Sequence, residues 1–208
     1  MKLLYVSASP RGQLSASKTA AAHYLATLGA RRPKLEIDTL DLWDTVLPEF
    51  DGAAIAAKYA RLAGRSLTDA EADAWRVIGA MVDRLKAGDS VLIATPMWNF
   101  GIPYKLKHWI DLITQPGLTF SFDPAYGYSP LISPKPALVI LSSAGDYVGG
   151  PSYGRPDLAT PYLRAALKFI GLPDIRFVPI GPTIGRADDV VRALDAARER
   201  LSDLAANA

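Results

Sequence analysis

The sequence predicts one doubly wound α/β domain over residues 1–208, in which a parallel β-sheet carries helices on both faces. Five short strand-like runs alternate with helical patterns, and three of these runs are almost wholly apolar. A strand that is apolar on both faces belongs inside a sheet covered on both sides. No repeat, low-complexity tract or Gly/Ser-rich linker divides the chain, so a single domain is expected.

The strand-like runs also predict the order of the sheet. In chain order they are Leu3–Ser7, Lys34–Leu40, Val91–Thr95, Ala137–Leu141 and Ile175–Ile180. The first, third and fourth runs are the apolar ones and should be central. The second alternates apolar and polar residues, and the fifth contains Pro179, which cannot donate to a neighbouring strand, so both suit edges. The resulting order, 2-1-3-4-5, is that of the flavodoxin-like fold, whose ligand crevice opens between strands 1 and 3.

Three helices are readable from their caps and apolar stripes. Thr68 with Glu71 three residues later forms a capping box, followed by apolar residues at helical spacing as far as Leu85. A second stripe covers residues 163–170 and ends before Gly171. A third runs from Val190 to Leu204.

Composition excludes several classes of site. The chain has no cysteine, which rules out disulfides, thiolate nucleophiles and Cys-bound zinc or iron–sulfur clusters, and no metal site is predicted. The formal net charge of +2 leaves no footprint for nucleic acid or membrane, and no apolar run approaches the ~18 residues of a membrane span. The initial apolar run is too short for a signal peptide and is interrupted at Pro10-Arg11-Gly12. A cytoplasmic protein is expected.

The loop after the first strand, residues 7–17, precedes a helix predicted at Lys18–Leu28. Its hydroxyls, at Ser9, Ser15 and Ser17, can donate to an anion at the N-terminus of that helix. The loop fits neither GxGxxG nor GxxxxGK[ST], so a phosphate monoester bound by dipoles is favoured. The alternative is that Ser15 or Ser17 only caps the helix. Arg11 either contacts the phosphate or, as we expect, points to solvent.

The loops after the third and fourth strands suggest a flat ligand. Trp98 and Phe100 flank Asn99 directly after a buried strand, where a heteroaromatic ring would stack and Asn99 would bond its edge. The alternative is a hydrophobic staple over the strand ends. Residues 142–150 are rich in small side chains, which let backbone approach a ligand closely. The alternative is an ordinary mobile turn.

These residues resemble a known family, the FMN-dependent NADH-azoreductases, also described as FMN-dependent NADH:quinone oxidoreductases. The segments that carry the resemblance are Ser9, Ser15–Ser17, Pro96–Phe100, Lys105–Lys107, Gly117–Phe120, Thr160–Leu163 and Phe169–Gly171. Pro96–Phe100 with Gly117–Phe120 downstream is the most specific part, and the likeness runs from residue 1 to near the C-terminus.

The resemblance implies a flavodoxin-like homodimer with one non-covalent FMN per subunit near the dimer interface. The residues it places around the phosphate are Ser9, Ser15, Ala16 and Ser17, and those around the isoalloxazine ring are Met97, Trp98, Asn99, Phe100, Ser142, Ser143, Ala144 and Gly145. It also implies ping-pong transfer, in which NADH reduces the flavin and a quinone or an azo compound then takes two electrons.

Two positions depart from the family pattern. Trp98 stands where tyrosine is common, and Ala144 stands within a stretch that commonly reads Ser-x-Gly-Gly. The insert Asp123–Pro130 is expected to form a lid or hairpin over the flavin. Phe120 and Tyr128 either stack on the substrate or belong to an aromatic core.

No side chain is predicted to be catalytic, because hydride transfer to flavin N5 is the cofactor's own chemistry. His23 and His108 are interpreted as structural or surface residues rather than general acids. NADH is favoured over NADPH because no arginine cluster marks a 2′-phosphate pocket.

One alternative function is a flavodoxin-type electron carrier without its own NADH oxidation, although carriers usually present an acidic face. A receiver-like domain would need acidic residues where Ser7 and Ser9 stand. A quinone reductase with incidental azo activity cannot be separated from the main hypothesis.

Overall fold

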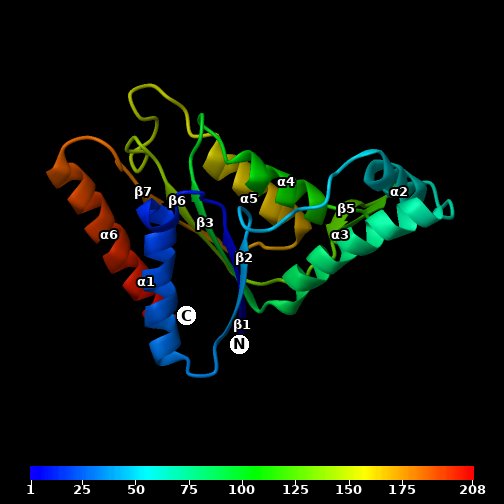
Figure 1. Cartoon of the computed structure of the whole chain (residues 1–208), viewed down its shortest axis with the longest axis horizontal. Helices are drawn as coiled ribbons and strands as arrows, with labels where there is room; N and C mark the ends of the chain where they lie inside the picture. The colour runs from blue at the N-terminus through cyan, green and yellow to red at the C-terminus, as the bar shows by residue number, and fades with distance from the viewer.

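The computed structural model describes all residues 1–208 and places a five-stranded parallel sheet between two layers of helices (Figure 1). In spatial order the strands are β2 (Glu36–Asp41), β1 (Lys2–Ser7), β3 (Ser90–Pro96), β6 (Ala137–Ser142) and β7 (Ile175–Ile180). All neighbouring strands are parallel. The five predicted runs are these five strands, with bounds that differ by at most two residues, and the two predicted edge strands lie at the edges.

The predicted strand numbering needs one correction. Two further strands, β4 (Phe120–Asp123) and β5 (Gly127–Pro130), form an antiparallel hairpin outside the sheet. The sheet order therefore reads 2-1-3-6-7 rather than 2-1-3-4-5. The hairpin strands have four residues each, too few for the alternation of apolar and polar residues to show in the sequence. The hairpin half of the prediction for residues 123–130 is confirmed.

Helices cover the two faces of the sheet unequally. α1 (Ala16–Arg31) and α6 (Ala187–Ala206) lie side by side on one face, and α3 (Asp69–Ala87), α4 (Tyr104–Ile113) and α5 (Ala159–Ile170) cover the other (Figure 1). α2 (Gly52–Leu62) packs on α3. None of these helices is both long and apolar enough to cross a membrane.

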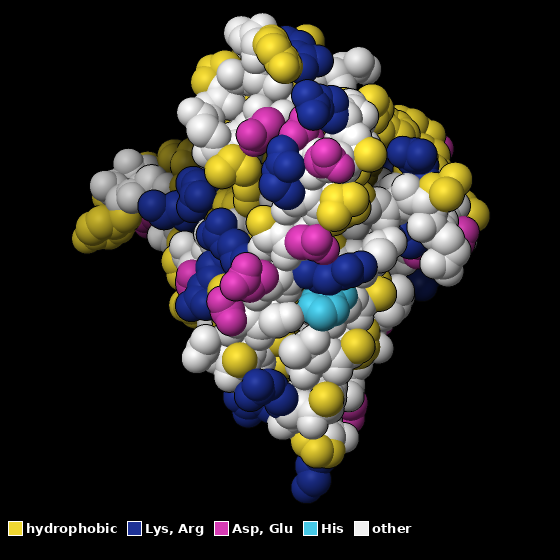
Figure 2. Space-filling view, turned by 90° about the vertical axis from the view of Figure 1, so that its left-hand side faces the viewer, with side chains coloured by type: hydrophobic (Ala, Val, Ile, Leu, Met, Phe, Trp, Pro, Cys, Tyr) yellow, Lys and Arg dark blue, Asp and Glu magenta, His cyan; other side chains and the backbone are white.

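The apolar strands are explained by two separate cores. Along β1, Leu3 and Tyr5 pack toward α1 and α6, whereas Leu4 and Val6 pack toward the helices of the other face. Successive side chains of a strand point to opposite faces, so a strand covered on both sides must be apolar throughout. The outer face of α1 and α6 carries interspersed basic and acidic side chains with scattered hydrophobic ones (Figure 2).

The caps predicted from the sequence are present. Thr68 Oγ1 accepts from the Glu71 backbone N–H, and Glu71 Oε2 accepts from the Thr68 N–H, which completes the capping box of α3. α5 ends at Gly171, which has a φ of 116° that only glycine adopts readily. α1 begins at Ala16, two residues before the predicted start at Lys18.

Parallel pairing brings three strand ends to one edge of the sheet. Ser7 of β1 pairs with Ala94 of β3, and Pro96 of β3 pairs with Ser142 of β6. The chain leaves β1 toward α1 on one face and enters β3 from α3 on the other. A crevice is expected where the connections diverge in this way.

Candidate cofactor site

A crevice runs along the C-terminal ends of β1, β3 and β6. Two adjoining cavities form it, with volumes of about 450 Å³ and 240 Å³, and both are lined by Met97, Ser143 and Ala144. The larger cavity reaches the start of α1, and the smaller one reaches Asn99 and Gly145. Their combined size suits a cofactor of a few ring systems.

The α1 end of the crevice is built to receive an anion. Ser15 is the N-cap of α1, and its Oγ accepts from the Lys18 backbone N–H at 3.2 Å. Ser17 is fully buried, with its Oγ 3.2 Å from that of Ser15. The backbone N–H groups of Ala16 and Ser17 have no acceptor within the chain, as the first turn of a helix requires. Capping by Ser15 and anion binding are compatible here, because the free N–H groups remain available.

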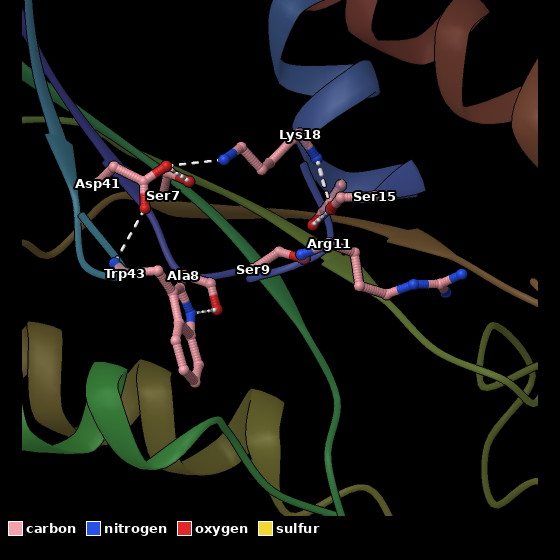
Figure 3. Close-up of polar contacts among 9 residues, drawn as sticks. Ser7, Ala8, Ser9, Arg11, Ser15, Lys18, Asp41 and Trp43 are labelled. Carbon is pink, nitrogen blue, oxygen red and sulfur yellow. Dashed lines mark hydrogen bonds and ion pairs between the residues drawn. The ribbon is translucent and has the colours of Figure 1, made fainter. Parts of the chain in front are cut away.

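Charged side chains contribute little to anion binding at the α1 end of the crevice. Lys18 Nζ lies 2.7 Å from Asp41 Oδ2. Burial raises the pKa of Asp41, but hydrogen bonds from Lys18, the Trp43 N–H and Ser7 outweigh it and hold the pKa below its usual value (Figure 3). The Lys18 ammonium is thus paired with the Asp41 carboxylate rather than directed to the crevice. Arg11 is exposed at the rim, and its side chain extends away from Ser9 and Ser15, which agrees with the solvent-facing expectation.

Ser9 is buried near the same point, and its Oγ has only a long contact, 3.5 Å, with the Arg11 N–H. Such a contact is weak, which leaves the hydroxyl available. The structure therefore brings Ser9, Ser15 and Ala16 together at one end of the crevice, and Ser17 contacts Ser15 without lining the cavity itself.

The second loop turns sharply at Asn99 and Phe100. Trp98 and Gly101 exchange backbone hydrogen bonds of 3.0 Å and 2.9 Å, and the two residues between them have φ values of 47° and 73°. Two consecutive positive φ angles define a type I′ turn, a strained conformation for phenylalanine. The N–H groups of Asn99 and Phe100 have no acceptor within the chain. Strain and free donors at one turn indicate a ligand-binding loop.

Trp98 has a partner that sequence reasoning missed. Its ring packs tilted against Trp43 at a centroid distance of 5.8 Å, and the Trp43 Nε1–H donates to the Ala8 carbonyl (Figure 3). Tyr104 packs edge-on against Trp43. Trp98 thus packs within an aromatic group, as the staple alternative supposes, but it also lines the larger cavity. Asn99 and Phe100 line the smaller cavity.

The third loop presents backbone to the same cavity. The Ser143 hydroxyl donates to the Gly145 carbonyl at 2.8 Å, and Thr183 donates twice to the Ser143 carbonyl. The N–H groups of Ala144 and Gly145 have no acceptor within the chain. Ala144 has no positive φ, so alanine is accommodated there without backbone strain. Its methyl group lines both cavities.

Two predicted substrate residues lie elsewhere. Phe120 and Tyr128 pack against each other in the β4–β5 hairpin and against Phe169 of α5, with centroid distances of 4.9–5.8 Å. Neither lines the crevice in this chain. The hairpin docks on α5 through these rings, so within the subunit it is not a lid. His23 Nε2 lies 2.8 Å from Ser202 Oγ and so links α1 to α6, a structural role as expected.

Other crevice residues were not predicted to line a site. They are Thr183, Ile184, Val190 and Leu194 on the larger cavity, and Tyr147 and Arg155 on the smaller one. Val190 and Leu194 belong to the predicted apolar stripe of α6. Their position at the start of the helix, next to the strand ends, could have marked them as lining residues.

The residues present fit FMN. An anion site of helical N–H groups and hydroxyls suits a phosphate monoester at one end. At the other end the free N–H groups of Asn99, Phe100, Ala144 and Gly145 suit the nitrogen and oxygen edge of an isoalloxazine ring. Met97 and Ser143 line both cavities, and Ser142 lines the larger one.

The fold and the site together define a class. A family model described as the flavodoxin-like fold matches residues 1–205, and the chain therefore belongs to this family.

Particular relatives extend the likeness. The chain is 52% identical over 204 residues to FMN-dependent NADH:quinone oxidoreductase 1 of Bradyrhizobium diazoefficiens, covering 98% of each chain. It is 43% identical to an FMN-dependent NADH:quinone oxidoreductase of Desulfotalea psychrophila, covering 98% of this chain and 96% of the relative. Among solved structures, an FMN-dependent NADH-azoreductase from Bacillus anthracis in complex with FMN has a TM-score of 0.83 and 26% identity, covering 98% of this chain and 99% of its own.

Proposed function

We propose that the protein is an FMN-dependent oxidoreductase that takes two electrons from NADH and passes them to quinones and azo compounds. One observation carries the proposal. A single crevice joins an anion site at the α1 N-terminus to a cavity where four unpaired backbone N–H groups meet aromatic side chains. The names of the relatives at 52% and 43% identity agree with it.

The chain's own groups would bind and orient rather than react. The first turn of α1 and the hydroxyls of Ser9, Ser15 and Ser17 would hold the phosphate. The N–H groups of the second and third loops would orient the ring, and Trp98 and Phe100 would limit access of water to it. Bound FMN supplies the hydride acceptor, N5. Because no side chain need act as nucleophile or general acid, none is assigned a catalytic role.

We further propose ping-pong turnover, with NADH and the acceptor using the same open side of the crevice in succession. NADH is the proposed donor because the arginines that line the crevice, Arg11 and Arg155, belong to different cavities and form no cluster for a 2′-phosphate.

A homodimer in the cytoplasm is the proposed state of the protein. Large aromatic side chains are exposed on the β4–β5 hairpin, namely Phe122, Tyr126 and Tyr128, and Phe122 packs against Tyr128. Apolar side chains grouped in this way favour an interface. Light scattering of the purified protein should give twice the mass of 22.4 kDa, and cell fractionation should recover it with the cytosol.

The test of the function is anaerobic mixing. The protein loaded with FMN should lose its flavin absorbance rapidly when mixed with NADH, and menadione or methyl red should restore it. Slow or absent bleaching would favour an electron carrier and contradict the proposal. A protein that cannot be loaded with FMN would also contradict it.

An occluding variant makes the location of the site testable. Ala144→Trp should abolish FMN binding, because an indole at this position fills the junction of the two cavities. Ala30→Trp is the matched control, since Ala30 is exposed near the other end of α1. Isothermal titration with FMN measures both variants. Equal FMN affinities in the two would place the cofactor elsewhere.

A further inference from the structure

We propose that Arg155 stabilises the negative charge that the flavin ring acquires on reduction, and so raises the reduction potential of bound FMN. This inference rests on the proposed function, and it adds a residue that the sequence did not single out.

Arg155 is a cation without a carboxylate partner in the ring end of the crevice. It lines the smaller cavity with Asn99, Ala144 and Gly145, and no other lysine or arginine does so. It takes part in none of the ion pairs of the chain. Its charge is therefore available to a ligand.

The guanidinium is held in place by its own turn. Ser152 and Arg155 exchange backbone hydrogen bonds of 3.1 Å and 3.0 Å around Tyr153 and Gly154, which both have positive φ. Arg155 Nε donates to the Ser152 carbonyl at 3.1 Å, and Nη2 donates to the buried Ser152 hydroxyl at 3.3 Å. These bonds restrain a side chain that would otherwise be mobile.

Gly145 brings the guanidinium against the third loop. A Cβ at this position would lie 2.9 Å from Arg155 Nη2 and 2.3 Å from Ser152 Oγ, both closer than real contacts allow. Glycine therefore permits Arg155 to lie beside the stretch where the N–H groups of Ala144 and Gly145 are free. The guanidinium and these two dipoles together make this end of the cavity positive.

The neighbouring carboxylates do not cancel this charge by direct pairing. Asp146 Oδ1 accepts from the Val148 N–H, and Asp157 Oδ1 accepts from the Ala159 and Thr160 N–H groups at the start of α5. Neither forms an ion pair with Arg155.

The chemistry of the ring explains why this matters. Donors such as the Asn99 amide and the free N–H groups match the pyrimidine half of isoalloxazine, which carries its oxygens, rather than the dimethylbenzene half. Hydride adds two electrons and one proton to a neutral ring, so the product carries one negative charge, shared between N1 and O2. A fixed cation near this edge favours the reduced form over the oxidised one, because the interaction is stronger with the charged state.

The experiment measures potentials and affinities. Arg155→Met should weaken binding of reduced FMN at least tenfold more than binding of oxidised FMN. For a two-electron couple, that ratio corresponds to a midpoint about 30 mV more negative. Arg155→Lys should retain most of the wild-type potential, since it keeps the charge. Gly145→Ala should shift the potential in the same direction as Arg155→Met by displacing the guanidinium.

Arg11→Met is the matched control, because Arg11 lines the other cavity. It should leave the ratio of the two affinities, and hence the potential, unchanged. Spectroelectrochemical titration gives the midpoint, and fluorescence titration gives the affinity for oxidised FMN.

The outcomes separate the two proposals. If Arg155→Met binds FMN with the wild-type potential, or if Arg11→Met shifts the potential as much, the role of Arg155 is wrong and the proposed function stands. If the wild-type protein neither binds FMN nor oxidises NADH, both are wrong.

Discussion

At the scale of single residues, two serines two positions apart have different environments. Ser15 caps α1 through its Oγ, whereas Ser17 lies within the first turn, fully buried beside it. Loss of a cap destabilises a helix by about 1 kcal/mol whether or not a ligand is bound. If the Ser17 hydroxyl bonds the phosphate, its loss should matter chiefly when the anion is present.

Ser17→Ala should therefore weaken FMN affinity by on the order of 1–3 kcal/mol, the value of a hydrogen bond to a charged group. The thermal midpoint of the apoprotein should change less than in Ser15→Ala, which loses the cap. Fluorescence titration and apoprotein melting, run on both variants, check this. An unchanged FMN affinity in Ser17→Ala would mean that this hydroxyl does not reach the phosphate.

Asp41→Asn should destabilise the protein at neutral pH by about 1–3 kcal/mol, because hydrogen bonds to a charged carboxylate are lost. The pKa of Asp41 is lowered in the folded state from its usual 3.8. Its contribution to stability is thus complete above the unfolded-state pKa and is lost as the pH falls through the folded-state pKa.

Urea unfolding of the wild type and Asp41→Asn between pH 7 and roughly pH 3 measures this. The difference in unfolding free energy should be constant at the upper end and shrink below about pH 4. A difference that stays the same over the whole range would mean that the charge of Asp41 has no stabilising role.

A residue's place in the site could be predicted from the sequence when it directly follows a strand with a recognisable apolar pattern. The serine loop and Trp98–Phe100 directly follow apolar strands, so their place at the sheet edge could be inferred from the strand pattern. Trp43 follows an edge strand, and Arg155 comes from a turn within a long connection. Their positions depend on tertiary contacts, Trp43 with Ala8 and Arg155 with Gly145, which local patterns do not encode.

At the scale of elements, the turn at Asn99 and Phe100 stores backbone strain beside the ring end of the crevice. Residues in such sparsely populated conformations cost on the order of 1–3 kcal/mol each and tend to persist at functional sites. Neighbouring contacts hold the turn: the Phe100 carbonyl accepts from Leu158, and the Met97 N–H donates to Ser142.

Asn99→Gly tests whether the loop is shaped for ligand or for packing. Glycine adopts a φ of 47° without strain, so the apoprotein should be as stable as wild type or more stable by up to about 1 kcal/mol. FMN affinity and the rate of bleaching by NADH should both fall, because the amide side chain is lost. Asn99→Ala would be a poorer test, because it would remove the amide side chain and add backbone strain at the same time.

Differential scanning of the apoprotein together with stopped-flow reduction distinguishes the possibilities. A less stable apoprotein with normal flavin reactivity would support the packing role of the loop.

Helices and strands could be predicted from the sequence where burial imposes a regular spacing of apolar residues. The five sheet strands and the capping box of α3 follow from residue types that burial and unsatisfied N–H groups require. The sequence predicted a hairpin at residues 123–130 but not its docking on α5 through Phe120 and Phe169, because an aromatic residue in a short segment packs equally well on a core or a ligand. Only the position of α5 decides between them.

At the scale of the whole molecule, the two halves of the crevice come from segments far apart in the chain. The anion site belongs to the first 17 residues, and the ring site to the loops after β3 and β6. A ligand that contacts both the anion site and the ring site should stabilise the folded state as a whole. At a free FMN concentration 100 times the dissociation constant, binding should add about 2.7 kcal/mol to the stability of the fold.

The most direct test compares FMN with riboflavin, which has the same ring but no phosphate, in isothermal titrations of the apoprotein. If the phosphate lies on the first turn of α1, FMN should bind at least tenfold more tightly than riboflavin, and Ser17→Ala should narrow this gap. Equal affinities for the two ligands in the wild-type protein would contradict the placement of the phosphate, and with it the assignment of the crevice.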